Sequence, residues 1–399
     1  MKKQLLHTPE GVRDIYNEEC EKKLLLQSDL LGILKGYGYH PIQTPTFEFF
    51  DIFGKEIGTT PSKELYKFFD REGNTLVLRP DMTPSIARAA AKYFMDEDMP
   101  IRLCYMGNTF INNSSYQGRL KESTQLGAEL IGDSTVDADA EILSMTVECL
   151  QKAGLKDFQL SVGHADFFQG LVEAAGISEE DEEELRELLA NKNFFGVEEF
   201  AETLNLKAEL NELFHMLGSL NVDLNDLKRA KELAASYPRI LAAIHNLEEL
   251  HKVLEVYGIQ KYISFELGII SSYQYYTGII FSGYTFGSGE PIVKGGRYDR
   301  LLTYYGKTSA SIGFAIVIDQ LMAALSRQKI NISIETNGEL IVYTKANQAK
   351  AILSAKEKRA AGTPVETILK DDTKTNEDYQ NYAKRNRIRT VTLIVSNDL

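Results

Sequence analysis

Residues 105–125 read YMGNTFINNSSYQGRLKESTQ, and this stretch decides the fold. It starts inside an apolar run, residues 101–106, that predicts a β-strand. The side chain of Ile111, in the middle of the stretch, has no hydrogen-bond donor and no charge, so it cannot stabilise a negatively charged group. A second informative stretch, residues 271–281, reads SSYQYYTGIIF and is followed by GGRYD at residues 295–299.

Both stretches resemble signature motifs of histidyl-tRNA synthetase, a class II aminoacyl-tRNA synthetase. The second class II motif of that family has the same length as residues 105–125 and reads roughly Phe-Arg-x-Glu, Gly-Arg, Arg/Lys-Glu and Gln. Its histidine signature reads roughly Arg-Gly-Leu-Asp-Tyr-Tyr-Thr-Gly, followed by Gly-Gly-Arg-Tyr-Asp. The resemblance covers most of the chain, from Thr8 to the C-terminal domain. It implies an α+β fold with the antiparallel sheet core of class II synthetases.

The order of expected elements indicates two domains. Residues 1–335 read as a synthetase-like core, interrupted at about residues 168–258 by an acidic helical insertion. In that insertion Ser178 precedes a run of acids, which is typical of a capped helix start. Residues 339–399 alternate between strand and helix patterns, as in a small α/β domain. This domain resembles a truncated anticodon-binding domain of the synthetase.

The residues retained in the motifs predict a histidine pocket. Asp81 and Thr83, within the sequence RPDMT at residues 79–83, resemble the family's carboxylate and hydroxyl that hold an α-ammonium group. Taken alone, they also fit a strand end followed by a helix cap. Gln125 and Glu129 match polar residues that contact histidine in the family, although the polar face of an ordinary strand has the same pattern. The resemblance adds three tyrosines around the imidazole and the carboxylate: Tyr275, Tyr276 and Tyr298.

Three other positions depart from the family, and each departure removes an arginine. Ile111 replaces the class-defining arginine that contacts the ATP α-phosphate and the amino-acid carboxylate. Ser271 replaces a catalytic arginine, and Gln320 replaces the arginine that stacks over the adenine. Arginine is a permanently charged, bidentate donor for phosphate, which none of the three replacements can be. The pattern predicts a protein that binds histidine and does not activate it.

This combination resembles a paralogue group of the family, the regulatory subunits of ATP phosphoribosyltransferase. The resemblance implies a non-catalytic protein, without aminoacylation activity, that is required for the first step of histidine biosynthesis and for its feedback regulation by L-histidine. It also implies a homodimer through the synthetase-like core and a hetero-octamer with the short-form catalytic subunit. Two alternatives stay open: a working histidyl-tRNA synthetase, and a stand-alone histidine- or tRNA-binding synthetase-like protein.

Composition narrows the remaining possibilities. The chain has 399 residues and a net charge of −13, which argues against nucleic-acid binding through its whole surface, so tRNA is not an expected partner. No apolar run reaches the length of a membrane span, and the N-terminus lacks the apolar stretch of a signal peptide. The three cysteines fit neither a disulfide framework nor a zinc cluster, which favours a cytoplasmic location. The histidines lack metal-binding spacing, and we expect no metal and no cofactor.

Overall fold

The computed structural model describes residues 6–54, 60–113, 120–270 and 275–395. The chain divides into two compact units, the core unit (Met1–Asn331) and the C-terminal unit (Ile332–Leu399), and each is described by itself. None of the helices in the described residues is both long and apolar enough to cross a membrane.

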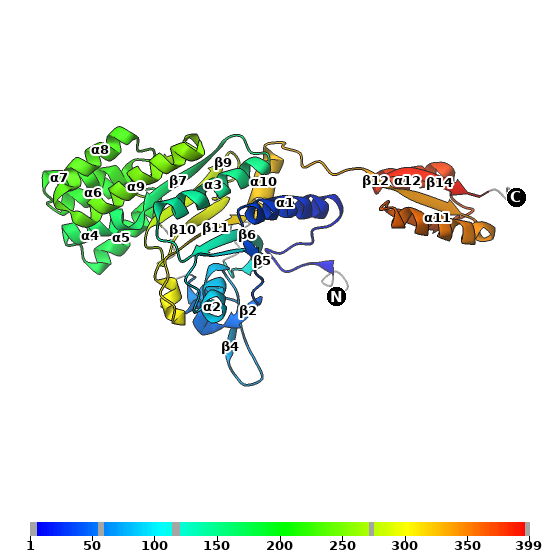
Figure 1. Ribbon diagram of the computed structural model, residues 1–399, viewed down its shortest axis with the longest axis horizontal. Coiled ribbons are helices and arrows are strands. Elements are labelled where there is room, and N and C mark those ends of the chain that lie inside the picture. Colours follow the sequence, from blue (N-terminus) through cyan, green and yellow to red (C-terminus); the bar gives the residue numbers. More distant parts are fainter. Residues whose placement is uncertain (1–5, 55–59, 114–119, 271–274, 396–399) are drawn as a thin grey trace. The chain divides into compact units, whose positions relative to one another are not determined.

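An eight-stranded sheet forms the centre of the core unit (Figure 1). The five inner pairs of neighbouring strands are antiparallel, and the pairs at the two edges are parallel. The antiparallel core expected from the sequence is therefore confirmed, with parallel pairing limited to two short edge strands. In spatial order the strands are β1 (His40–Pro41), β5 (Ile101–Phe110), β6 (Glu122–Ile131), β11 (Ser311–Val317), β10 (Val293–Arg297), β9 (Ile279–Thr285), β7 (Phe158–His164) and β8 (Ile263–Phe265).

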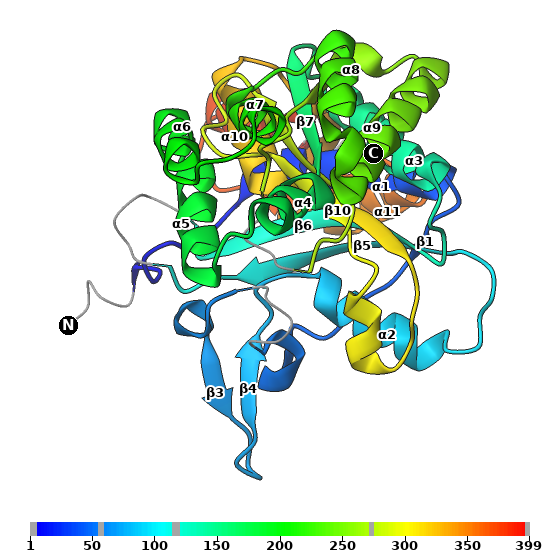
Figure 2. The same ribbon diagram turned by 90° about the vertical axis from the view of Figure 1, so that its left-hand side faces the viewer.

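Helices cover both faces of this sheet, and the strand alternation assigns side chains to each face. On β6 the odd-numbered side chains, such as that of Ile131, face α2 (Thr83–Tyr93), which packs on the same apolar cluster. The even-numbered side chains point the other way. Figures 1 and 2 show three helices on that opposite face: α1 (Asn17–Gly36), α3 (Val136–Lys152) and α10 (Ile318–Arg327).

Between β7 and β8 the chain is helical, in the region where the sequence predicts an acidic insertion. The oxygen of Ser178 accepts a hydrogen bond of 3.2 Å from the backbone N–H of Asp181, so it caps its helix as expected. The helices of this segment are α4 (Ala165–Ala175), α5 (Glu179–Ala190), α6 (Phe194–Thr203), α7 (Ala208–His215), α8 (Leu224–Leu233) and α9 (Pro238–Tyr257).

A small antiparallel sheet extends from the core unit on the side of α2 (Figure 2). Its strands are β2 (Phe47–Phe49), β4 (Thr75–Leu78) and β3 (Lys67–Phe69), with β4 in the middle. Val77 packs on Phe53 and Leu65 in a buried cluster. Four phenylalanines of the two edge strands are exposed instead: Phe47, Phe49, Phe68 and Phe69. This sheet therefore presents apolar surface to the outside.

The C-terminal unit is a three-stranded parallel sheet with one helix on each face. Its elements are β12 (Asn337–Tyr343), α11 (Gln348–Ala360), β13 (Val365–Leu369), α12 (Asn376–Arg385) and β14 (Ile388–Ile394). Along β12, Leu340 and Val342 pack against α12, while Ile341 packs against α11. The strand is apolar on both faces because both faces are covered, which explains its continuous apolar run. The small α/β fold expected for this region is confirmed.

Candidate functional site

A cavity in the core unit gathers every residue of the predicted histidine pocket. The seven predicted residues that line it are Asp81, Thr83, Gln125, Glu129, Tyr275, Tyr276 and Tyr298. Its empty volume is ≈ 400 Å³ when the open mouth is included, and the part inside it that the centre of a water-sized sphere can reach is ≈ 30 Å³. The residues come from α2, β6, the segment before β9 and the end of β10. Residues far apart in the sequence therefore meet at one place.

The floor of the cavity is a row of three paired residues on neighbouring strands, one glutamate and two glycines. Glu129 on β6 pairs with Gly313 on β11, which in turn pairs with Gly296 on β10. A Cβ atom at position 313 would lie 1.6 Å from a carboxylate oxygen of Glu129. Only glycine at this position leaves the carboxylate room to lie over the sheet.

A buried arginine fixes the turn that brings α2 to the cavity. Arg79 is 5% exposed, and its guanidinium donates to the backbone carbonyls of Thr44, Pro45 and Asn108 at 2.8–3.0 Å. These bonds tie the end of β4 to the chain before β2 and to β5. The arginine that begins the RPDMT motif is therefore structural, and it places the next residues, Asp81 and Thr83, over the sheet.

The predicted alternative, in which Asp81 and Thr83 only cap a helix, describes the structure in part. One oxygen of Asp81 accepts the backbone N–H of Met82 at 2.8 Å, at the start of α2. The other oxygen accepts from the hydroxyl of Tyr275 at 3.2 Å. The hydroxyl of Thr83 donates to the carboxylate of Glu129 at 2.9 Å. Both residues thus use their side chains within the cavity as well as at the helix start.

Glu129 is the most unusual titratable group of the cavity. It is 1% exposed and accepts hydrogen bonds from the hydroxyls of Tyr298, at 2.5 Å, and Thr83, at 2.9 Å. Burial raises the pKa of Glu129 to about 8, although both hydrogen bonds favour the ionised form and oppose that shift. No lysine or arginine among the described residues forms an ion pair with it. Its ionised form therefore has no cationic partner within the described residues, and a cationic ligand would favour that form.

Asp81, just before α2, repeats this pattern. It is 4% exposed, and burial raises its pKa despite hydrogen bonds from Met82 and Tyr275. A carboxylate in a dry site is costly unless it is paired. Two such groups facing one cavity favour a ligand that carries positive charge and several N–H donors.

Aromatic rings and one amide complete the walls. The ring of Tyr275 lies 4.8 Å from that of Tyr276 and 5.9 Å from that of Tyr298, measured between centroids. The side-chain oxygen of Gln125 is buried and has no hydrogen-bond partner among the described residues. Buried acceptors are nearly always satisfied in folded proteins, so this oxygen is suited to a donor on a ligand. Gln125 and Glu129 both lie on β6 and line the cavity, an arrangement that suits a ligand site.

Two of the positions that lack the family's arginines, Ile111 and Gln320, lie outside this lining. Ile111 directly follows β5, and its backbone N–H donates to the carbonyl of Lys121 at 2.9 Å. Gln320 lies in the first turn of α10, beside Asp319, which is paired with Lys23 at 2.8 Å. Neither residue is among those lining the cavity. Ser271 lies outside the described residues.

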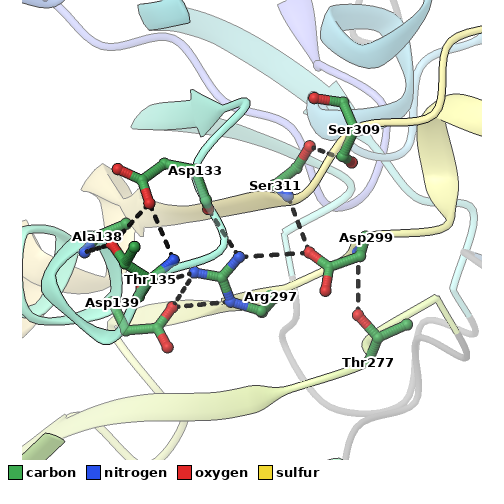
Figure 3. Close-up of polar contacts among 9 residues, drawn as sticks. All are labelled: Asp133, Thr135, Ala138, Asp139, Thr277, Arg297, Asp299, Ser309 and Ser311. Carbon is green, nitrogen blue, oxygen red and sulfur yellow. Dashed lines mark hydrogen bonds and ion pairs between the residues drawn. The ribbon is translucent and has the colours of Figure 1, made fainter. Parts of the chain in front are cut away.

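Arg297 anchors the end of β10 next to the cavity, a role that the sequence did not predict. Figure 3 shows its guanidinium among the residues at the start of α3, and the side chain of Asp139 accepts from it at 2.5 and 2.9 Å. Further bonds reach the backbone carbonyls of Asp133 and Thr135. Burial raises the pKa of Asp139 to about 6, and the neighbouring guanidinium opposes the shift. Arg297 thus fixes the end of β10, where Tyr298 enters the cavity.

A second acid, Asp299, links the same arginine to the neighbouring strand. Its carboxylate accepts from the backbone N–H of Ser311 at 2.9 Å and from Arg297 at 3.4 Å. Its own backbone N–H donates to the hydroxyl of Thr277 at 2.9 Å. In the Arg-Tyr-Asp sequence, the first and third side chains therefore anchor the end of the strand, and the middle side chain faces the cavity. Among the described residues, no cluster of histidine, cysteine or acidic side chains is arranged to hold a metal ion.

Comparisons with known proteins agree with this geometry. The family model described as histidyl-tRNA synthetase matches residues 11–321. This match places the chain in the class of histidyl-tRNA synthetase-like proteins. An ATP phosphoribosyltransferase regulatory subunit of Ruminiclostridium cellulolyticum is 38% identical over 100% of this chain and 94% of its own length. A protein of the same name from Acetivibrio thermocellus is 38% identical over 91% of this chain and 87% of its own.

A solved structure gives the same result in three dimensions. The crystal structure of an ATP phosphoribosyltransferase regulatory subunit/histidyl-tRNA synthetase from Bacillus halodurans has a TM-score of 0.86 and 31% identity, covering 98% of this chain and 99% of that one. The chain belongs to the family of ATP phosphoribosyltransferase regulatory subunits, whose fold is that of histidyl-tRNA synthetase.

Proposed function

We propose that this chain is a non-catalytic regulatory subunit of ATP phosphoribosyltransferase that senses L-histidine through the cavity described above. Its family membership supports the first part of the proposal. The observation that carries the second part is the pair of buried carboxylates, Asp81 and Glu129, facing one cavity without an ion-pair partner among the described residues. The chain has no aminoacylation activity of its own, and it supports the first step of histidine biosynthesis by acting on its catalytic partner.

Histidine carries hydrogen-bond donors that match the two buried acids of the cavity, Asp81 and Glu129. Its α-ammonium group donates to Asp81 and to the hydroxyl of Thr83, which lie side by side at the start of α2. Its imidazole donates a ring N–H to Glu129, beside the hydroxyl of Tyr298. Because Glu129 has a raised pKa, it can give its proton to the ring and form a buried imidazolium–carboxylate pair. Gln125 and the remaining tyrosines enclose the ring.

The partner of this chain is the catalytic subunit of ATP phosphoribosyltransferase, in its short form, and the assembly is a hetero-octamer located in the cytoplasm. The family name supports the pairing itself. A homodimer through the core unit agrees with the exposed phenylalanines of the small sheet, since Phe49 and Phe69 are 55% and 72% exposed. Surface of this kind is costly in water and is often covered by another protein.

Feedback regulation requires that histidine bind one arrangement of the assembly more tightly than another, because equal affinities shift no equilibrium. In this proposal the catalytic subunit supplies all the chemistry. Occupation of the cavity changes how strongly this chain supports that chemistry.

Calorimetric titration of L-histidine into the purified chain tests the site. We expect wild type to bind, and Glu129→Ala to lose at least about 30-fold in affinity, because it removes a charged hydrogen bond to the ring. Glu129→Gln keeps the shape of the side chain and reports on the charge alone. Glu183→Ala, an exposed acid of α5, is the matched control and should bind as wild type does. Equal affinities in all four proteins, or no binding at all, would show that the assigned pocket is wrong.

Two further measurements separate the alternatives. Histidine-dependent exchange between ATP and pyrophosphate would show a working synthetase, and we expect none. Co-purification with the short-form catalytic subunit, with histidine-sensitive transferase activity of the complex, supports the regulatory subunit. Failure to associate would favour a stand-alone histidine-binding protein.

A further inference from the structure

Lys294 is a charged residue of the cavity to which the motifs give no role. It lies on β10, two residues before Gly296, and lines the same cavity as Asp81 and Glu129. Among the described residues it is the one lysine or arginine in that lining. Its side chain is exposed, and no hydrogen bond or ion pair joins it to another described residue. Among the described residues, the lining therefore has one cation, which acts on Asp81 through its charge and forms no ion pair or hydrogen bond with the protein.

The sheet register places Lys294 at a defined distance from Glu129. Lys294 pairs with Ala315, which pairs with Gly127, two residues before Glu129 on β6. Side chains two residues apart on a strand point to the same face, so both residues face the cavity. Their backbones are two strand spacings apart across the sheet, about 10 Å, and two residues apart along it, about 7 Å. The long lysine side chain shortens that separation to one that a single amino acid can bridge.

The three charged groups of the lining form a pattern that fits a free amino acid. Asp81 sits near the start of α2 and Glu129 sits on the floor, both buried, whereas Lys294 is exposed at the rim. A zwitterion presents one cation and one anion on the same carbon, and an imidazole adds a second group that can be positive. Two carboxylates and one ammonium therefore complement histidine charge for charge.

The anion of the ligand has few other partners in this cavity. Ile111 offers no charge and does not line the cavity. The hydroxyls of Tyr298 and Thr83 already donate to Glu129. In their ionised forms, which a bound cation favours, the two buried acids would repel a ligand carboxylate placed near them. The rim beside Lys294 is the part of the lining where negative charge is favoured.

We infer that Lys294 binds the α-carboxylate of the ligand, so that the cavity selects free zwitterionic histidine over analogues without a carboxylate. This inference rests on the proposed histidine site and adds the group that recognises the carboxylate. It gives the site a specificity suited to sensing the free amino acid. Histidine bound in a peptide or as an amide lacks the anion that Lys294 requires.

Calorimetric titrations with L-histidine, L-histidinamide and histamine, all in the full-length chain, test this role. Histidinamide keeps the ammonium and the ring but is neutral where histidine has its carboxylate, and histamine lacks that group altogether. For Lys294→Met we expect histidine affinity to fall about 10- to 100-fold, while the affinities for the two analogues stay unchanged. Lys294→Arg should retain most of the affinity for histidine because it keeps the charge. Lys228→Met, at an exposed lysine of α8, is the matched control and should behave as wild type.

The outcomes distinguish this inference from the proposal beneath it. If wild type binds histidine and Lys294→Met binds it equally well, the carboxylate role is wrong and the histidine site stands. If Lys294→Met weakens histidine and histamine by the same factor, Lys294 acts on the pocket in general and the inference is also wrong. If wild type binds none of the three ligands, the histidine site itself is wrong and the inference fails with it.

Discussion

The amino-acid side of the site and the positions that would serve a nucleotide differ in the charge that the chain keeps there. On the amino-acid side Asp81 and Glu129 are buried and their pKa values are raised, so the protein bears an electrostatic cost that a cationic ligand can relieve. Ile111 and Gln320 carry no charge, at two positions where the resemblance to the synthetases implies arginines that contact a nucleotide. A polyphosphate needs cations and is repelled by buried acids. The difference supports the proposal that the site recognises an amino acid and lacks the means to activate it.

The largest effect on the free energy of unfolding is expected when Arg297 loses its buried ion-pair partner. Arg297 is 6% exposed and uses its charge on Asp139, behind the cavity wall. Asp139→Ala leaves that guanidinium buried without a carboxylate, and we expect the free energy of unfolding to fall by about 3–5 kcal/mol. Denaturant unfolding measures this change. Asp137→Ala, at an exposed acid of the same helix, should cost about 1 kcal/mol or less. Equal losses in both variants would show that the pair with Arg297 contributes nothing special.

A change of about 2 kcal/mol is expected from pH alone. In the unfolded chain Glu129 has a pKa of about 4.3, whereas burial raises it to about 8 in the folded protein. Between these values the folded protein holds a proton that the unfolded chain has lost, so the free energy of unfolding falls as pH rises. Above about pH 8 both states are ionised and the fall ends. From pH 6.5 to pH 8 the expected loss is about 2 kcal/mol at most.

This window separates Glu129 from two other buried groups, His164 and Asp139. Burial lowers the pKa of His164 to about 4, so above pH 6.5 this residue is neutral in the folded state and largely neutral in the unfolded state. Burial raises the pKa of Asp139 only to about 6, so Asp139 is mostly ionised throughout the window. Glu129→Gln should remove most of the slope between pH 6.5 and 8 in denaturant unfolding. A slope unchanged by this substitution would show that Glu129 is ionised in the folded protein at neutral pH.

A smaller effect, about 3- to 10-fold in histidine affinity, is expected at Thr83. Thr83→Val keeps the shape of the side chain and removes the hydroxyl that donates to Glu129 and faces the proposed ammonium position. Ser85→Ala is the matched control on the same helix, because the hydroxyl of Ser85 is buried without a hydrogen-bond partner among the described residues. Calorimetry with L-histidine should show weaker binding for Thr83→Val and unchanged binding for Ser85→Ala. The reverse result would move the ammonium site away from the start of α2.

Much of the fold and of the candidate site could be predicted from the sequence because short motifs specify both. Glu129 and Tyr298 lie far apart in the chain, yet the resemblance placed both in one pocket, and the structure brings them to 2.5 Å. What such motifs leave out are contacts set by strand register and long loops. Nothing in the GGRYD motif says that Arg297 meets Asp139, because that pairing depends on how α3 crosses the sheet.

Lys294 is a second example of a residue whose surroundings the sequence motifs do not predict. In the sequence it is one charged residue next to an apolar strand, and most such lysines are solvated and have no specific role. Its proposed role follows only from the alignment of β10, β11 and β6, which places Lys294 in the lining of a cavity with two buried acids. The parallel pairing of β1 and β8 at the sheet edges was likewise not predicted, since strands of two or three residues carry almost no periodicity.

The difference between the amino-acid side and the nucleotide positions is tested most directly by a ligand that should leave the melting temperature unchanged. Histidine bound at 100 times its dissociation constant should stabilise the chain by about 2.7 kcal/mol and raise its melting temperature by several degrees. ATP with magnesium, at millimolar concentration, should leave the melting temperature of the same protein unchanged, because Ile111 and Gln320 supply no charge for the phosphates or the adenine. A substantial shift of the melting temperature with ATP, abolished by Glu129→Ala or Lys294→Met, would place a nucleotide in this cavity. It would contradict the proposal that the chain has lost nucleotide binding. Thermal denaturation with each ligand alone and with both together makes the measurement, and glycine serves as the control amino acid without a ring.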